Sequence, residues 1–148
     1  MNDREATGKA SAAERDLLEL LRRTLPARDL HEVAVEAVEE GEIRLRFPFR
    51  PGYLGPGEIF SGPLLLSFAD TAIYAAVQVD LPEDRIALTS TLNVSFLRPA
   101  QAQDVVALSR VLRRGRRIAH AEAWLFSYAA TDPILHATAS CVLAARPI

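Results

Sequence analysis

The stretch from Gly62 to Asp80 constrains this chain more than any other, because it predicts a long apolar helix that carries an acid. Pro63 suits a first helical turn, where its missing N–H is not needed, and the Leu and Ala residues that follow favour a helix. The polar residues of the stretch recur at spacings of three and four, which places them on one narrow stripe. They are Ser67, Asp70, Thr71, Tyr74 and Gln78. The other faces are apolar, so the helix predicted over about residues 62–79 is wrapped on nearly all sides.

Asp70 is the residue of this helix that most needs an explanation. No Lys or Arg lies between Ser61 and Asp84 to pair with it. A carboxylate on a largely buried helix is unfavourable unless a group outside the helix satisfies it. Asp70 is therefore the first candidate for a functional residue. The alternative is a polar residue that bonds to a neighbouring loop, or to solvent at a subunit boundary.

Composition narrows the class of protein. The 148 residues suffice for one domain with a hydrophobic core, and the net charge of −2 gives no bulk attraction to nucleic acid or acidic lipid. The single cysteine, Cys141, excludes an internal disulfide and cysteine-cluster metal sites and favours a reducing compartment. The N-terminus lacks the apolar core of a signal peptide, and no run reaches the roughly 18 apolar residues of a membrane span. We therefore expect a cytoplasmic protein with no metal, nucleic-acid or membrane partner.

The rest of the chain predicts one further helix and six strands. Residues 1–11 are small and polar, so we expect them to be disordered and a single domain to span residues 12–148. Ser11 and Glu14 form a capping box that begins a helix, and Pro26 ends it after Leu25. Alternating apolar residues then predict a hairpin over residues 31–49, before the long helix, and a four-stranded meander after it. The meander strands are residues 86–97, 104–112, 118–128 and 134–144.

The alternation of apolar and polar residues also predicts which side chains share a face of each strand. In the strand of residues 86–97, strict alternation places Thr89 on the face opposite Leu92 and Val94. A sheet that packs one face against the long helix would bury that helix on one side only. Because the helix is apolar nearly all round, we expect the sheet to curl around it and a second subunit to cover what remains.

This arrangement resembles the hotdog fold, an α+β fold in which a curved antiparallel sheet of about six strands wraps around one long central helix. Here an N-terminal helix is added. The segment Ala69-Asp70-Thr71-Ala72 is similar to the helix start of the phenylacetate-pathway (PaaI-like) acyl-CoA thioesterases, which carry His-Gly-Gly, a short spacer and Ala-Asp-Thr-Ala. Residues 91–100, with Asn93 and Phe96-Leu97-Arg98-Pro99, resemble the family's next strand, and Arg114-Gly115-Arg116-Arg117 resembles its basic hairpin. The resemblance covers the chain from about Leu30 to the C-terminus.

The resemblance implies an acyl-CoA thioesterase. In that family the helix acid, matched by Asp70, is the general base or nucleophile, and the backbone N–H of the first helix glycine, matched by Gly62, polarises the thioester carbonyl. Along a helix these two residues lie about 12 Å apart, too far to serve one thioester within one subunit. The resemblance therefore implies a homodimer, alone or paired into a homotetramer, in which Asp70 of one chain faces Gly62 of the other. It implies no cofactor beyond the coenzyme A of the substrate.

The chain departs from the family motif near the helix start. Ser61 stands in place of the family's histidine, Gly55 in place of an upstream asparagine, and Pro63 in place of the second glycine. We expect Ser61 and Pro63 to contact substrate beside Gly62, with the Ser61 hydroxyl taking over part of the histidine's role. Thr71 and Asn93 are further candidates for substrate contacts, although a purely structural role is the simpler interpretation of each.

Two further groups of residues are candidates to bind the two ends of the substrate, the coenzyme A phosphates and the acyl group. Arg114 and Arg116 are predicted to bind the phosphates of coenzyme A, since the arginine fork matches phosphate geometry; a solvated hairpin tip is the alternative. Phe60, Phe68 and Tyr74 are the candidates to line the acyl pocket, and they fit a medium-chain or an aryl group equally well.

Functions of different classes fit this pattern. The first is an acyl-CoA thioesterase that hydrolyses a small or medium acyl- or aryl-CoA thioester at a dimer-interface site. The second is a non-catalytic hotdog protein that binds acyl-CoA or another acyl ligand, which the absence of the family's His and Asn favours and the presence of Asp70 and Gly62 disfavours. A hotdog dehydratase is a weaker interpretation, because such enzymes pair their acid with a nearby histidine. None of His31, His120 and His136 lies near Asp70 in the sequence.

Overall fold

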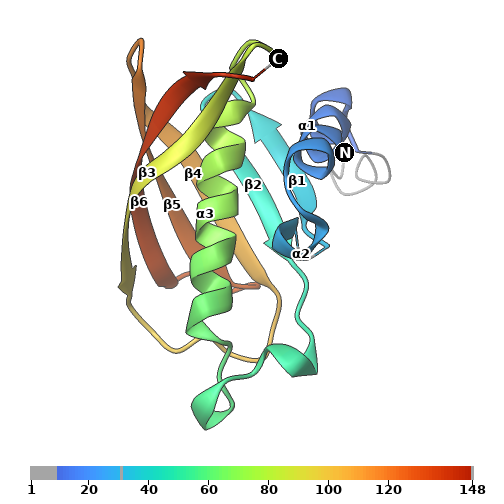
Figure 1. Cartoon of the computed structure of the whole chain (residues 1–148). Coiled ribbons are helices and arrows are strands. Elements are labelled where there is room, and N and C mark those ends of the chain that lie inside the picture. The colour runs from blue at the N-terminus through green and yellow to red at the C-terminus, as the bar shows by residue number, and fades with distance from the viewer. Residues whose placement is uncertain (1–9, 31, 148) are drawn as a thin grey trace.

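The computed structural model describes residues 10–30 and 32–147 and consists of one long helix surrounded by a curved sheet (Figure 1). The helices are α1 (Ala12–Thr24), α2 (Ala27–Leu30) and α3 (Gly62–Gln78), with 3₁₀ turns at Pro51–Tyr53 and Pro56–Glu58. The strands are β1 (Ala34–Glu39), β2 (Glu42–Phe47), β3 (Arg85–Phe96), β4 (Val105–Arg114), β5 (Ile118–Ser127) and β6 (Pro133–Ala145). Within the described ranges, none of the helices is long and apolar enough to cross a lipid bilayer.

The six strands form one antiparallel sheet in the order β1-β2-β4-β5-β6-β3. The predicted four-stranded meander is therefore wrong for β3, which pairs with β6 at the far edge (Figure 1). The turn between α3 and β3 is short, so β3 starts beside the end of α3 and forms an edge of the sheet. The loop of residues 97–104 then carries the chain across to β4, which pairs with β2.

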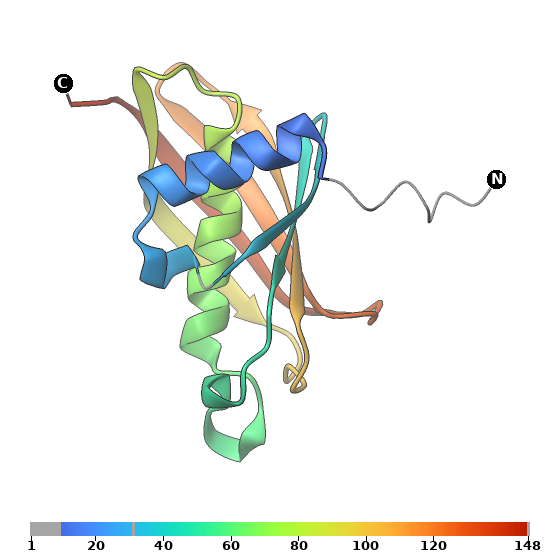
Figure 2. The same ribbon diagram turned by 90° about the vertical axis from the view of Figure 1, so that its right-hand side faces the viewer.

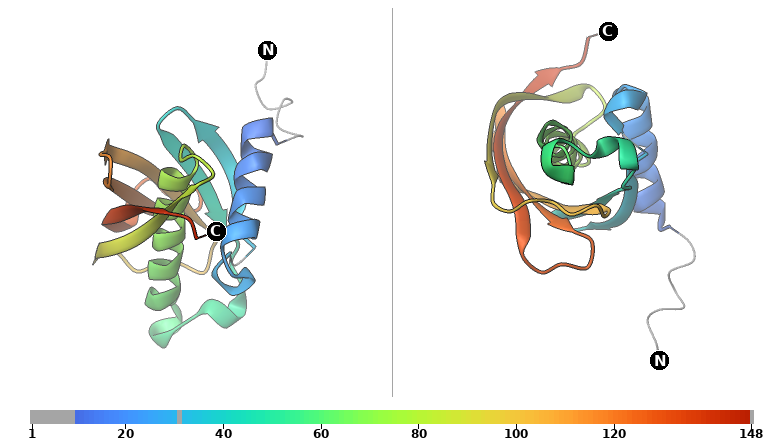
Figure 3. Two further views of the ribbon diagram at one scale, coloured as in Figure 1. Left: turned by 45° about the horizontal axis from the view of Figure 1, so that its top comes forward. Right: turned by 90° about the horizontal axis from the view of Figure 1, so that it is seen from below.

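The concave face of the sheet wraps around α3, as the apolar character of the predicted helix requires (Figure 3). Alanines dominate the contact from both sides. They are Ala69, Ala72, Ala75 and Ala76 on α3, and Ala107, Ala119, Ala121, Ala123, Ala137 and Ala139 on the strands, all of them buried. Small side chains let the sheet approach the helix closely enough to curl around it. The predicted hotdog architecture is confirmed, with the long helix ending at Gln78.

Helix α1 covers part of α3 that the sheet leaves open. It begins with the predicted capping box, in which Ser11 Oγ accepts from the Glu14 N–H and Glu14 Oε2 accepts from the Ser11 N–H, each at 3.2 Å. Leu17 and Leu21 are buried beneath it, and the helix crosses α3 at a steep angle (Figure 2). Part of the cover expected from a second subunit thus comes from the chain itself. The disorder expected of residues 1–11 concerns mainly residues 1–9, which lie outside the described residues.

Asp104 joins the end of β2 to the loop that enters β4. Its Oδ1 accepts the backbone N–H of Phe49 at 2.7 Å, and its Oδ2 accepts Arg46 Nε at 2.7 Å. The hydrogen bond from Phe49, followed by the bond from Arg46, lowers the pKa of the Asp104 carboxyl below its ordinary value. The ionised form of Asp104 therefore stabilises the folded state.

We expect Asp104→Asn to reduce the free energy of unfolding by about 1 kcal/mol at neutral pH, because a neutral amide loses the charge-assisted bonds. A lowered folded-state pKa gives stability that is present above the usual carboxyl pKa and is lost as the pH falls through the folded-state value. The difference between wild type and variant should therefore shrink below about pH 4. Urea unfolding at neutral and acidic pH measures it, with the exposed turn variant Asp132→Asn as the control. A difference that persists in acid contradicts this account.

Candidate functional site

A cleft of about 560 Å³ lies between α3 and the start of β3, and the C-terminal end of α1 meets it. Helix α3 contributes five residues to the lining, β3 contributes residues 86–89, and the end of α1 contributes Thr24 and the C-cap residue Leu25. The α3 residues are Leu66, Ser67, Asp70, Thr71 and Tyr74. Four of the five residues of the polar stripe that the sequence predicts thus face this cleft, and Gln78 is the exception.

Asp70 is held in this cleft by a group outside its own helix. Thr89 Oγ1 donates a hydrogen bond to Asp70 Oδ1 at 2.8 Å. The sequence failed to identify Thr89, because strict alternation places it on the wrong face. A β-bulge between Thr89 and Thr91 shifts the register with β6, so Thr89 points toward α3, as Leu92 and Val94 do.

Cys141 lies beneath Thr89 and contributes no charge to the cleft. It pairs with Thr89 across β3 and β6 and is buried. Burial raises the pKa of its thiol more than the hydrogen bond with Thr89 lowers it, and the Asp70 charge raises it further. Among the described residues that line the cleft, Asp70 carries the only formal charge.

Gly62 and its neighbours form a second group at the start of α3. A Cβ atom built on Gly62 would lie 3.6 Å from Cε1 of Phe96, so the ring of this β3 residue covers the glycine. Ser61 precedes the helix, makes no side-chain capping bond, and donates its N–H to the Tyr53 carbonyl at 2.9 Å. A Cβ atom on Gly55 would lie 3.5 Å from Ser61 Cα. The two positions where this chain departs most from the family motif are therefore in contact.

The predicted site residues thus fall into separate places within one chain. Thr71 lines the cleft with Asp70, whereas Ser61, Gly62 and Pro63 lie two helical turns away and outside its lining. Asn93 is exposed farther along β3 and is also outside the lining. Of the candidate acyl-pocket residues, Tyr74 lines the cleft. Phe60 and Phe68 are fully buried in an aromatic cluster around Phe47 instead.

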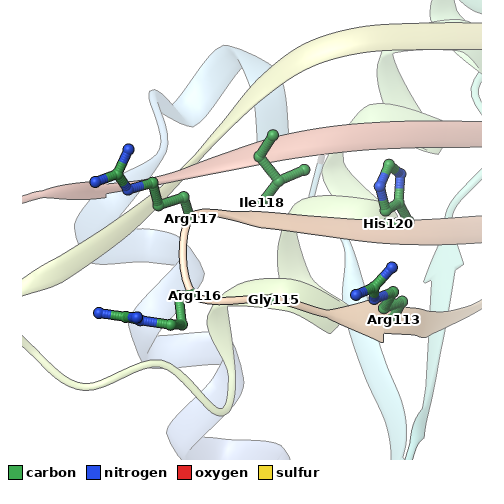
Figure 4. Close-up of a pocket in the computed structure, with 6 residues that line it drawn as sticks. All are labelled: Arg113, Gly115, Arg116, Arg117, Ile118 and His120. Atoms are coloured by element: carbon green, nitrogen blue, oxygen red, sulfur yellow. The ribbon is translucent and has the colours of Figure 1, made fainter.

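The predicted phosphate-binding arginines have different surroundings. Arg114 Nη2 donates to the Val77 carbonyl at 3.2 Å and so attaches the β4–β5 hairpin to the end of α3. Arg116 lines a hollow of about 460 Å³ together with Arg113, Arg117 and His120 (Figure 4). Within residues 10–30 and 32–147, no acid forms an ion pair with the three arginines of this hollow. Arg113 pairs with His120 on the outer face of the sheet.

The outer face also carries a buried acid that the sequence did not single out. Glu122 accepts Arg110 Nε at 2.7 Å and contacts His136 Nε2 at 2.9 Å, and the His136 ring stacks on Trp124. Burial raises the pKa of Glu122, but the bonds from His136 and Arg110 outweigh burial and lower it overall. Since this cluster lies on the far side of the sheet, neither His136 nor His120 reaches Asp70. His31 lies outside the described residues.

Gln78 fixes the start of β3 relative to α3. Its side-chain amide is buried, its Oε1 accepts the Ala87 N–H at 2.9 Å, and its Nε2 donates to the Arg85 carbonyl at 3.1 Å. The amide therefore satisfies the outward backbone groups of the edge strand as a neighbouring strand would. This contact positions Thr89 opposite Asp70.

Comparison with known proteins points to one family. Residues 57–129, which include the cleft residues of α3 and β3, match the model of the thioesterase superfamily. A Halobacterium salinarum protein named "putative esterase" is 40% identical over 95 residues, which cover 61% of this chain and 62% of that protein. A Thermoplasma volcanium protein with the same description is 33% identical over 91 residues, which cover 62% of this chain and 68% of its own length.

Solved structures agree with this assignment. A "putative thioesterase" from Silicibacter sp. TM1040 superimposes with a TM-score of 0.80 at 27% identity and covers 88% of this chain and 91% of its own. A protein from Ralstonia eutropha JMP134, named "putative thioesterase, phenylacetic acid degradation-related protein", superimposes with a TM-score of 0.74 at 26% identity. That match covers 85% of this chain and 98% of the Ralstonia chain.

We expect Gln78→Leu to reduce the free energy of unfolding by roughly 2–3 kcal/mol, because it leaves the Ala87 N–H and the Arg85 carbonyl without their partner. Leucine has a similar volume, so the loss reports the hydrogen bonds rather than a cavity. Urea unfolding measures the change, and Gln101→Leu on an exposed loop is the control. A variant as stable as the wild type would show that the amide does not hold β3 in place.

Proposed function

Because the chain belongs to the thioesterase superfamily, we propose that it is an acyl-CoA thioesterase acting on a small or medium acyl- or aryl-CoA thioester. The observation that carries this proposal is Asp70, a carboxylate on a buried helix that is oriented by Thr89 toward a cleft with aliphatic walls. The name of the Ralstonia eutropha structure and the Ala69-Asp70-Thr71-Ala72 motif favour the PaaI-like type within the superfamily.

In the proposed reaction Asp70 either activates water or attacks the thioester carbonyl itself. Attack forms a C–O bond and places negative charge on the carbonyl oxygen, which the Gly62 N–H at the positive end of α3 stabilises. Removal of one such donor typically weakens catalysis by roughly 3–4 kcal/mol. Collapse of the intermediate breaks the C–S bond, and the coenzyme A thiolate leaves and takes up a proton. Attack by Asp70 gives an acyl-enzyme anhydride, which a water molecule then hydrolyses.

The separation of the two groups makes a homodimer part of the proposal. Asp70 and Gly62 lie about 12 Å apart along α3, so the Gly62 N–H that serves an Asp70 would come from the second copy. The outward edge of β3 has no strand partner among the described residues, and large apolar side chains lie exposed near it. They are Leu66, Phe96 and Leu97, of which Phe96 also covers Gly62. Pairing of two copies along this edge would bury these side chains. It would also bring Asp70 of one copy close to Gly62 of the other.

We assign the coenzyme A phosphates to the basic hairpin. Arg116, with Arg113 and Arg117, presents guanidinium groups that have no acidic partner in the described part of the chain. Arg114 is better suited to hold the hairpin, because it already donates to Val77. The alternative function, an acyl-ligand binding protein, draws its support from Ser61 and Gly55, which lack the imidazole and the side-chain amide that the family motif has there.

We expect Asp70→Asn to reduce kcat/KM by about 100-fold or more, because an amide neither accepts a proton from water nor attacks a carbonyl. Asparagine keeps an acceptor for Thr89, so the fold and the cleft should be retained. Thiol release from short, medium, long and aryl acyl-CoA substrates measures turnover, and Asp80→Asn in the exposed turn after α3 is the control. Full activity of the Asp70 variant excludes this mechanism. No turnover by the wild type, with acyl-CoA still raising Tm, favours the binding protein.

A shared site also predicts complementation between inactive variants. Asp70→Asn should be inactive alone, and so should Gly62→Pro, which removes the backbone N–H at the first helical position, where proline is tolerated. A refolded mixture of the two should regain about a quarter of wild-type activity, since half the dimers are mixed and each has one intact site. The thiol-release assay on the mixture, compared with each variant refolded alone, makes the measurement. A mixture no more active than its components excludes a site built from Asp70 of one chain and Gly62 of the other.

A further inference from the structure

We propose that Tyr74 and Thr24 form the floor of the acyl-binding part of the Asp70 cleft and limit the length of the uncharged acyl group that it accepts. The inference rests on the proposed function, because it specifies the acyl group of the same site. It assigns a specificity-determining role to α1, which lies outside the residues 57–129 that match the family model.

A chain of hydrogen bonds fixes this floor. The Tyr74 hydroxyl donates to Thr24 Oγ1 at 2.8 Å, and Thr24 Oγ1 donates to the Leu20 carbonyl at 2.8 Å. Each hydroxyl has a single proton, and both protons are used in this chain. Tyr74 is only 8% exposed, so its ring is held between the two helices. The side chain is therefore a rigid wall and not a mobile group that a ligand displaces without loss.

The position of the floor relative to Asp70 sets the depth of the site. Tyr74 lies four residues after Asp70, on the same side of α3 and about 6 Å along its axis. In the opposite direction the cleft ends at Leu66, which is 40% exposed. An acyl chain whose carbonyl is at Asp70 therefore extends toward the closed end at Tyr74, and the pantetheine arm leaves past Leu66.

The lining of the cleft restricts the chemistry of the acyl group. Leu25, Leu66 and Ile86 give it aliphatic walls, and it contains no Lys, Arg or His among its described lining residues. A carboxylate at the end of the acyl chain would lose hydration without a cation to pair with, in a cleft already made negative by Asp70. The proton of the Tyr74 hydroxyl is already donated to Thr24 and so cannot serve it. The site is thus suited to neutral acyl groups of limited length.

The test compares Tyr74→Leu with the wild type on acetyl-, butyryl-, hexanoyl-, octanoyl- and lauroyl-CoA. Leucine is shorter than tyrosine, so the variant has a deeper cleft. Each additional methylene of the acyl chain that fits into this space should raise kcat/KM roughly tenfold. We expect the ratio of kcat/KM for lauroyl-CoA over butyryl-CoA to rise at least about tenfold. Tyr74→Phe keeps the ring and should keep the wild-type preference. Tyr128→Leu, the same change on an exposed outer-face residue, should leave the preference unaltered.

A second variant keeps the proposal testable if Tyr74→Leu does not fold. Leu25→Phe adds volume at the same end from the α1 side, and we expect it to lower the same ratio at least about tenfold. Unchanged length preference in the folded Tyr74 or Leu25 variant overturns the proposal, as does an equal shift in Tyr128→Leu. Succinyl-CoA, compared with butyryl-CoA, tests the requirement for a neutral group, and equal kcat/KM for the two overturns that part.

The dissociation constants of the same acyl-CoA series separate this proposal from the proposed function. They are measured by calorimetry with each floor variant in the Asp70→Asn background, where hydrolysis does not interfere. If the wild type hydrolyses nothing but Tyr74→Leu shifts the affinity toward longer chains, the floor is correct and the thioesterase activity is wrong. If the wild type hydrolyses acyl-CoA and neither rate nor affinity responds to the floor variants, the thioesterase stands and the floor is excluded. Absence of both turnover and binding overturns both.

Discussion

Close packing between the alanines of the sheet and the alanines of α3 is the constraint on which the rest of the molecule depends. Because six inner positions of β4, β5 and β6 are alanines, the sheet can approach the helix closely, curl around it and cover most of its circumference. A larger side chain at these positions would push the sheet away. The uncovered arc of α3 lies between the edge strand β3 and helix α1. The polar stripe that includes Asp70 opens to a cleft there, so the geometry of the core decides where the chemistry is located.

The edge strand β3 links this core to the candidate site through two local irregularities. Gln78 satisfies the outward backbone groups of Arg85 and Ala87, and the bulge at Thr89 to Thr91 turns one hydroxyl toward the helix. Past the bulge, the outward edge remains without a strand partner in the described part of the chain. A long unpaired edge with apolar neighbours is normally protected in proteins, and the proposed dimer provides that protection. The same contact that hides the edge would complete the site.

The sequence predicted well what depends on local pattern. The span of α3, its polar stripe and the Ser11–Glu14 capping box all follow from side-chain spacing, which the structure confirms. Strand order did not follow, because alternation in β3 carries no information about which strand it pairs with. Thr89 was placed on the wrong face because a bulge inserts one residue and reverses the alternation. An amphipathic α1 predicts a buried face but not the surface it covers, so its contact between Thr24 and Tyr74 was also missed.

The charge of Asp70 itself argues for catalysis over simple binding. A protein that only held a neutral acyl chain would bind it better with an amide or a leucine at position 70, because a carboxylate in a cleft with aliphatic walls is hard to desolvate. Thr89 donates to this carboxylate and orients it without neutralising its charge. Ser61 and Gly55, by contrast, lie in contact, and Pro63 follows one residue after Gly62, so the three departures from the family motif lie together at the start of the helix. In the proposed reaction, the site therefore keeps both the attacking group, Asp70, and the N–H donor to the oxyanion at the start of α3.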